Sequence, residues 1–155
     1  TYSEYCILEN DTAVGNCSFT AGALPASFVV DGTNEAKVLS VWLRDASGNV
    51  SVRRDSNSVT LDTIAPVLAS ITVDNGSPTD TNPFALSWGA VTGTYSHYCI
   101  RENDTNSNNC TFVAGSLPAS FSVSNVDETK TLHAWLRDAA GNLSARVSSA
   151  AITYN

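Results

Sequence analysis

The last 62 residues of the chain repeat the first 62. Residues 1–62 align with residues 94–155 without a gap, and about 35 of the aligned positions are identical. The octet WLRDASGN at 42–49, for example, returns as WLRDAAGN at 135–142. Self-similarity at one fixed offset indicates two copies of a single structural module. We therefore predict two domains, one over residues 1–61 and one over residues 62–155.

The first copy of the module is incomplete. The segment 62–93 has no counterpart ahead of Thr1, so whatever it builds in the second copy is missing from the first. We expect Thr1 to be an internal boundary of a longer tandem array rather than a native terminus. The alternative is a vacancy that strands from another subunit fill by β-augmentation.

Short β-rich runs bounded by Gly, Pro, Asn and Asp follow one another about every ten residues. This spacing is typical of a β-sandwich, and helical periodicity is hard to find. In the second copy the predicted strands cover residues 67–73, 83–88, 95–102, 110–114, 119–124, 129–137 and 143–154, the last of them bent or broken. Seven strands in about 90 residues is the size of an immunoglobulin-like module. The predicted fold is all-β, with two tandem sandwiches of which the first lacks its two N-terminal strands.

Alternation along these strands separates a buried face from an outer face, because successive side chains of a strand point to opposite sides. The residues that we expect to point inward are mostly large and apolar: Phe84, Leu86, Trp88, Tyr98, Ile100, Phe121, Val123, Leu132, Ala134, Leu136 and Ile152. Together they predict one compact core for the second copy.

Three stretches of the second copy resemble known extracellular modules. FALSWGAVTGTYSHYCI resembles the second and third strands of fibronectin type III domains, with Trp88 and Tyr98 at the positions of that family's core Trp and Tyr. LHAWLRDAAGNLS and DTIAP are similar to parts of bacterial immunoglobulin-like and fibronectin-like repeats of secreted and surface proteins. The resemblance implies immunoglobulin/fibronectin type III-like sandwiches. It does not imply one task, since the family includes adhesin stalks, enzyme spacers and fibre subunits.

The four cysteines form two pairs with the same spacing. Cys6 and Cys17 recur as Cys99 and Cys110, without the C-x-x-C motif that zinc sites and redox dithiols often use. We predict the local disulfides Cys6–Cys17 and Cys99–Cys110. Such bonds imply an oxidising compartment, so we expect an extracellular or cell-surface location. The usual fibronectin pattern lacks these disulfides.

The chain is acidic, with 15 Asp and Glu against 8 Lys and Arg and a formal net charge of -7. A surface of this charge repels nucleic acid and anionic lipid. No apolar run approaches the roughly 18 residues that a membrane span needs. We therefore expect neither nucleic-acid binding nor membrane insertion.

A Trp beside an Arg repeats on the predicted outer sheet face, as Trp42 with Arg44 and as Trp135 with Arg137. We expect both Trp side chains to be exposed there. One interpretation is that each Trp covers its local disulfide or stacks on the Arg, which needs no ligand. The other is a repeated platform for a glycan ring or a neighbouring subunit, because an exposed aromatic patch is destabilising unless a partner covers it.

The octet itself is predicted to end a strand in a hairpin turn, not to form a reactive loop. Asp138 is expected to accept backbone N–H bonds across the turn, and Gly141 to take a positive φ. His97 and His133 are expected to be neighbours on the outer face, a weak candidate for a metal or pH-sensitive site. The first copy lacks both His residues, and residues absent from one copy cannot be the chemistry of both.

The repeated acidic stretches ENDT at 9–12 and 102–105 offer oxygen ligands for calcium, but Asn and Asp are also expected there simply as turn formers. We predict no metal, no cofactor and no catalytic residues. The expected function is a non-enzymatic structural or adhesive segment of a larger extracellular bacterial surface or filament protein. Its expected partners are neighbouring repeats or subunits of the same protein, or a glycan or host-surface protein. The alternative function is a carbohydrate- or protein-binding module that uses the Trp/Arg face and the hairpin loops.

Overall fold

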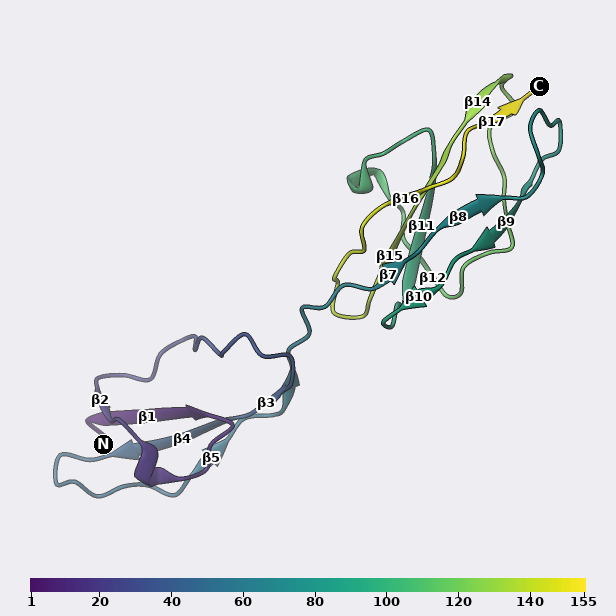
Figure 1. Ribbon diagram of the computed structural model, residues 1–155. Helices are drawn as coiled ribbons and strands as arrows, with labels where there is room; N and C mark the ends of the chain where they lie inside the picture. The colour runs from purple at the N-terminus through teal and green to yellow at the C-terminus, as the bar shows by residue number, and fades with distance from the viewer. The chain divides into compact units, whose positions relative to one another are not determined.

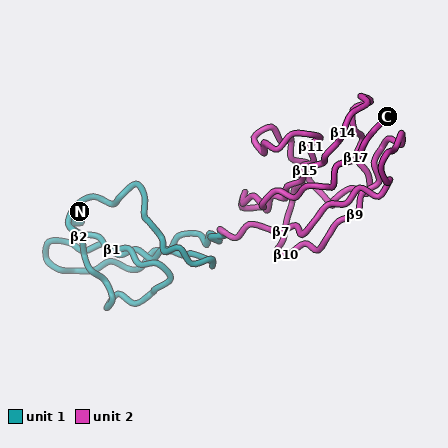
Figure 2. The backbone as a smooth tube through the Cα atoms, turned by 45° about the horizontal axis from the view of Figure 1, so that its top comes forward, with its two compact units in different colours: residues 1–62 teal, residues 63–155 magenta.

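The computed structural model describes residues 1–155 and consists almost entirely of short strands and loops (Figure 1). Its helical segments are two 3-10 turns, Val14–Asn16 and Ser107–Asn109. The chain divides into two compact units, unit 1 (Thr1–Asp62) and unit 2 (Thr63–Asn155) (Figure 2). Every sheet is built from strands of one unit.

Unit 2 is a β-sandwich. Its strands are β7 (Val67–Leu68), β8 (Ile71–Val73), β9 (Phe84–Trp88), β10 (Val91–Thr92), β11 (His97–Glu102), β12 (Val113–Ala114), β13 (Ser120–Phe121), β14 (Glu128–Lys130), β15 (Leu132–Arg137), β16 (Val147–Ser148) and β17 (Ile152–Tyr154). One sheet has the order β12-β11-β15-β16 and the other β13-β9-β8, while β10-β7 and β14-β17 form two-stranded ladders. Two antiparallel sheets of four and three strands are the architecture of immunoglobulin-like and fibronectin type III-like sandwiches. The predicted fold class is confirmed.

The core of unit 2 contains side chains from both sheets. Its buried members are Leu68, Ile71, Val73, Phe84, Leu86, Val123, Leu132, Ala134, Leu136, Ile152 and Tyr154. The half-buried side chains of Trp88, Tyr98, Ile100 and Phe121 pack against this cluster. Every residue that alternation predicted to point inward is therefore in the core or against it.

Two strands predicted as continuous are broken, because the chain changes partners along them. The predicted strand 67–73 becomes β7, which pairs with β10, and β8, which pairs with β9. The predicted strand 129–137 becomes β14, which pairs with β17, and β15, which pairs with β11 and β16. At the second break, Asn103 Oδ1 accepts a hydrogen bond from the Thr131 amide at 2.8 Å. The last predicted strand, 143–154, is broken into β16 and β17, as expected, and the remaining predicted strands are present with shorter bounds.

Unit 1 repeats the four-stranded sheet of unit 2 but not the three-stranded one. Its strands are β1 (Glu4–Glu9), β2 (Thr20–Ala21), β3 (Ala36–Lys37), β4 (Leu39–Arg44), β5 (Arg54–Asp55) and β6 (Val59–Thr60). The order β2-β1-β4-β5 matches β12-β11-β15-β16, and the pair β3-β6 matches β14-β17. No strands of unit 1 correspond to β13-β9-β8, so the first sandwich lacks its N-terminal strands, as predicted.

Candidate functional site

The candidate site is the outer face of the four-stranded sheet, which both units build from the same residues. Cys6 is the cross-strand partner of Trp42 on β1 and β4, and Cys99 is that of Trp135 on β11 and β15. Trp42 is 4% exposed and Trp135 is 3% exposed. The prediction that both Trp side chains are exposed is therefore wrong.

The Trp residues are buried within a layer that contains the disulfides. The Cys6–Cys17 and Cys99–Cys110 bonds are formed, as predicted, and Cys6 and Cys99 are each 2% exposed. Side chains of directly opposite residues in an antiparallel pair lie in contact. Each disulfide also anchors a loop beside its Trp. Strand alternation therefore predicted correctly on which side of the sheet each Trp lies, but it did not predict that the Trp would be buried. This burial favours the structural interpretation of the Trp residues.

Reduction of the disulfides is expected to lower the melting temperature without abolishing the β fold of unit 2. Each bond joins cysteines separated by 11 positions, and the chain-entropy model gives up to about 3 kcal/mol for a loop of this size. Calorimetry with and without reductant measures the change, and mass spectrometry of alkylated cysteines verifies that reduction occurred. An unchanged melting temperature in verified reduced protein would refute the stabilising role.

The two Arg residues of the candidate site stack on Phe, a contact that the sequence analysis missed. The Arg44 Cζ atom lies 4.3 Å from the Phe19 ring centroid, and Arg137 Cζ lies 4.3 Å from that of Phe112. Arg44 Nε also donates a hydrogen bond to Glu4 Oε2 at 2.5 Å. The equivalent repeat positions of the two Phe residues were the available clue. Each unit thus has a half-buried Arg–Phe pair on this face.

An Asp side chain organises each disulfide loop. In unit 2, Asp104 accepts hydrogen bonds from the Asn106 amide at 2.9 Å, from Asn109 Nδ2 at 2.9 Å and from Arg101 Nη2 at 2.8 Å. These three bonds lower the pKa of Asp104 to about 2. In unit 1, Asp11 bonds the Ala13 amide in the same way at 2.8 Å. The ENDT stretches therefore act here as turn formers.

Acid is expected to destabilise unit 2 partly through Asp104. A carboxyl whose pKa is lower in the folded state stabilises the fold above its unfolded value, and this contribution is lost as the pH falls through the folded value. For Asp104 the window runs from 3.8 down to about 2. Urea unfolding between pH 5 and 2 measures the effect, and Asp104→Asn should flatten the pH dependence in that window. Asp127→Asn, at an exposed bend, is the control, and equal curves for both variants would contradict the assignment.

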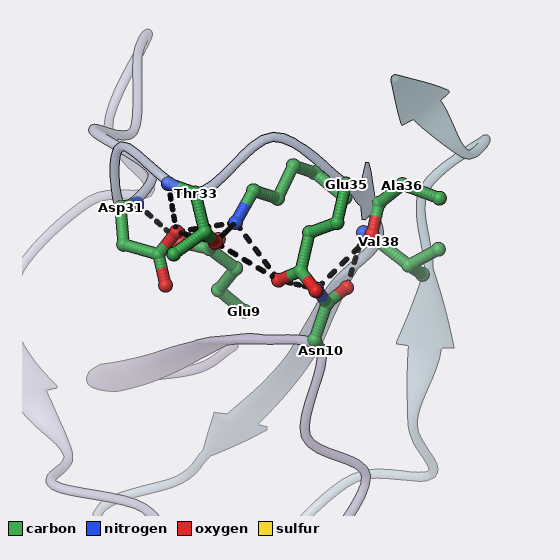
Figure 3. Close-up of polar contacts among 8 residues, drawn as sticks. Glu9, Asn10, Asp31, Thr33, Glu35, Ala36 and Val38 are labelled. Atoms are coloured by element: carbon green, nitrogen blue, oxygen red, sulfur yellow. Dashed lines mark hydrogen bonds and ion pairs between the residues drawn. The ribbon is translucent and has the colours of Figure 1, made fainter. Parts of the chain in front are cut away.

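The two lysines of the chain form a second repeated cluster, which the sequence analysis also missed. In unit 1, Lys37 is 5% exposed, and its Nζ lies 2.6 Å from Glu9 Oε1 and 3.0 Å from Glu35 Oε1 (Figure 3). It also contacts the Asp31 carboxylate and donates to Thr33 Oγ1 at 2.7 Å. The carboxylate oxygens of Glu9, Asp31 and Glu35 lie within 4.8 Å of one another, a spacing that the lysine ammonium between them explains.

The cluster of unit 2 is more deeply buried. Lys130 is 0% exposed, and its Nζ lies 2.6 Å from Glu102 Oε1 and 2.8 Å from Glu128 Oε1. Ser124, in the place of Asp31, accepts a hydrogen bond from Nζ at 2.5 Å. Burial alone would lower the pKa of Lys130, but the bonds to the two Glu carboxylates raise it above its ordinary value. Lys130 is therefore a charged ion-pair partner and not a neutral nucleophile.

His97 and His133 are not neighbours, contrary to the prediction. His97 is opposite Arg137 on β15, whereas His133 is opposite Arg101, four positions farther along β11. His133 Nδ1 is hydrogen-bonded to Ser148 Oγ at 2.8 Å. Burial, reinforced by Arg146, lowers the pKa of His133. The strand register thus separates the two imidazole rings by four residue positions along the sheet.

The repeated octet forms a hairpin turn, as expected. The Asn142 amide donates to Asp138 Oδ1 at 2.8 Å, and the Asp138 amide donates to the Asn142 carbonyl at 3.1 Å. Gly141 has a φ of 97°. The equivalent turn of unit 1 has the same bonds between Asp45 and Asn49. The octet therefore forms the same hairpin turn in both copies.

Gly141→Val is expected to destabilise unit 2 by about 1–2 kcal/mol, because a side chain raises the energy of a left-handed backbone. An added Cβ meets no atom within 4 Å, so the cost comes from the backbone and not from a clash. Ala140→Val in the same turn, where φ is not positive, is the matched control. Chemical denaturation of both variants gives the difference, and equal stabilities would show that the turn does not need glycine.

No helix of the structure has the length and apolar character required to cross a bilayer. No family model matches the sequence, and no curated protein matches it. Among solved structures, the chain is similar to the fibronectin(III)-like modules of Clostridium thermocellum CbhA, with 12% identity and a TM-score of 0.48. The similarity covers 99% of this chain and 78% of that one.

Proposed function

We propose that the chain is a non-enzymatic structural or adhesive repeat segment of a larger extracellular bacterial surface or filament protein. The observation that carries this proposal is that the repeated polar and reactive side chains are used in internal bonds. The thiols form disulfides, and the lysines form ion pairs with Glu carboxylates. The repeated Trp residues are buried as well. What the two copies share therefore holds each unit together.

The extracellular part of the proposal rests on the disulfides. All four cysteines are bonded, and each bond recurs at the same place in the repeat. Disulfides form and persist in oxidising compartments and are rare in the cytosol. Small secreted domains, which bury a limited hydrophobic core, often depend on disulfides for stability.

The disulfide loops are the surface that we assign to partner contacts. Residues 13–15 read AVG in unit 1, whereas the equivalent residues 106–108 read NSN in unit 2. The same disulfide thus supports loops with different side chains in the two units. This difference suits contacts with neighbouring repeats, other subunits or a host protein or glycan. A glycan platform built on Trp42 and Trp135 is disfavoured, because a sugar ring cannot stack on a buried indole.

Protease treatment of intact source cells tests the proposal. An antibody against unit 2 should detect a polypeptide larger than 16.3 kDa that protease removes from the cell surface or from isolated filaments. Its cysteines should resist alkylation until a reductant is added. Protease protection inside intact cells, together with free thiols, would refute the extracellular assignment. In-frame deletion of the segment should reduce attachment or filament assembly, and unchanged values of both would refute the structural or adhesive role.

A further inference from the structure

Unit 2 has a basic cluster, formed by Arg101, His133 and Arg146, beside its disulfide loop. The strands β11, β15 and β16 are neighbours in one sheet (Figure 1). Arg101 on β11 is opposite His133 on β15, and His133 is opposite Ser148 on β16. Arg146 lies two positions before Ser148, so alternation places it on the same side of the sheet. The three side chains of the cluster therefore lie side by side across three strands.

Both arginines of the basic cluster contact the disulfide loop. Arg101 Nη2 donates a hydrogen bond to Asp104 Oδ2 at 2.8 Å. Arg146 Nη1 donates to the Thr105 carbonyl at 3.4 Å. The cluster and the loop thus form one continuous surface.

Unit 1 does not have this cluster. The three equivalent positions of the repeat are occupied by Leu8, Ser40 and Arg53. The remaining cation is neutralised, because Arg53 Nε lies 2.9 Å from Asp55 Oδ1, and Asp55 stands in the place of Ser148. The basic cluster is therefore not needed for the architecture that the two units share.

The charges of the basic cluster are only partly compensated. Asp104 pairs with Arg101, whereas Arg146 contacts a carbonyl and not a carboxylate. Arg101 Nε is buried without a hydrogen-bond partner, which is uncommon for a buried donor. Charges more than about 8 Å away are largely screened at physiological salt. A ligand at the cluster therefore meets a local positive charge, although the chain as a whole carries -7.

The loop beside the cluster adds neutral hydrogen-bonding groups. Residues 105–108 read TNSN, whereas the equivalent residues 12–15 of unit 1 read TAVG. Thr105, Asn106 and Asn108 are exposed, and their hydroxyl and amide groups can both donate and accept hydrogen bonds. A sugar offers hydroxyl groups to such side chains, whereas an acidic peptide offers few. Guanidinium groups, in turn, bind carboxylates through paired N–H donors.

We propose that the basic cluster and the adjoining loop of unit 2 bind an acidic polysaccharide through the carboxylate groups of its uronate sugars. Arg101 and Arg146 hold a carboxylate, and the loop side chains bind the sugar hydroxyls. Trp135 is buried and takes no part in stacking on the sugar. The inference rests on the adhesive role proposed above and deepens it by naming the partner class of one disulfide loop.

NMR titration of the whole chain with a galacturonate oligosaccharide tests the proposal. Saturable shifts are expected at Arg101, His133 and Arg146, and none at the equivalent positions of unit 1. The affinity should fall as salt is added, because the contacts are between charges near the surface. The methyl ester of the same oligosaccharide lacks the carboxylate charge and should not bind. Equal binding of the ester would overturn the proposal.

Arg146→Gln should weaken binding of the galacturonate oligosaccharide by about 10-fold, the effect of losing one charged hydrogen bond. Arg146 is exposed, so the substitution leaves the core intact. Arg54→Gln is the matched control, because it removes one exposed cation from unit 1 and changes the net charge equally. It should change the affinity by less than about 2-fold. Equal losses in the two variants would show attraction to any cation and overturn the site.

His133 provides a readout that is independent of affinity. Burial, reinforced by Arg146, lowers the pKa of its imidazole, while Asp104 acts in the opposite direction, and Arg101 is its cross-strand neighbour. A carboxylate bound at the cluster favours the charged imidazole and should raise the pKa of His133. His97, four positions farther along β11 than Arg101, should change less. An unchanged pKa of His133 at saturating ligand would place the sugar elsewhere.

Poly-glutamate separates the sugar from an acidic peptide. It should bind more weakly than the galacturonate oligosaccharide at equal carboxylate concentration, and equal or tighter binding would identify an acidic peptide as the partner and overturn the proposal. Absence of galacturonate binding would also overturn it. The protease and deletion experiments above do not use this ligand, so the adhesive role can hold when the glycan site fails.

Discussion

Leu136→Ala is expected to lower the free energy of unfolding of unit 2 by about 2–5 kcal/mol, and Leu43→Ala to cost unit 1 less than half as much. The two leucines occupy the same position of the repeat. Leu136 is 0% exposed between two sheets, whereas Leu43 is half-buried and lines an open cavity. Truncation of Leu136 leaves a cavity that the packed sheets cannot close. Truncation of Leu43 removes a side chain that solvent already reaches.

Urea titration with residue-resolved NMR measures the two units separately in the same chain. Val113→Ala, at a 48% exposed position of unit 2, is the control and should change stability by less than about 0.5 kcal/mol. Equal losses for the two leucines would mean that the inner face of unit 1 is covered in solution.

The fold could be predicted because two independent patterns agree. Alternation along residues 84–88 and 132–136 placed Phe84, Leu86, Leu132 and Leu136 inside, and the structure buries all four. The repeat offset then showed that residues 62–93 were present once, which predicted a first sandwich without its N-terminal strands. Both inferences use short-range or fixed-offset information, which a single sequence contains.

The cover of the outer face could not be predicted in the same way. Alternation assigns Trp42 and Trp135 to the side away from the core, but it carries no information on whether a loop lies beside them. The disulfides were predicted from their spacing, yet the extent to which the loops bury each indole depends on tertiary packing. The prediction of exposed Trp failed at that step.

The lysine clusters show a related limit. Lys130 meets Glu102, which lies 28 positions earlier, because β14 continues through Thr131 into β15 and β15 pairs with β11. No local pattern joins residues at that distance. The available clue was that the two lysines and their Glu partners recur at one offset, which in an acidic chain indicates charge pairing rather than chance.

The two units therefore share a complete outer layer and differ in the inner one. Disulfide, Trp, Arg–Phe pair and lysine cluster are present in both. The closed core is present in unit 2. Substitutions in the outer layer should consequently act alike in the two units, unlike the two leucine substitutions.

Trp135→Ala is expected to cost unit 2 about 3–5 kcal/mol, the range of a large aromatic truncation in a packed interior. The indole is 3% exposed and opposite Cys99, so its removal leaves a cavity beside the disulfide. Trp42→Ala should produce a comparable loss in unit 1, where the indole is 4% exposed. Urea titration followed by NMR of each unit measures both values.

Arg137→Ala provides the matched comparison on the same strand, because it removes the cation that stacks on Phe112 but leaves the indole in place. Its cost should be well below that of Trp135→Ala, since a half-exposed cation–π contact contributes little. A ligand platform would give the opposite pattern: Trp135→Ala would cost less than about 1 kcal/mol and would abolish binding to a glycan panel. That result would mean that Trp42 and Trp135 are exposed and that the outer face is a binding site.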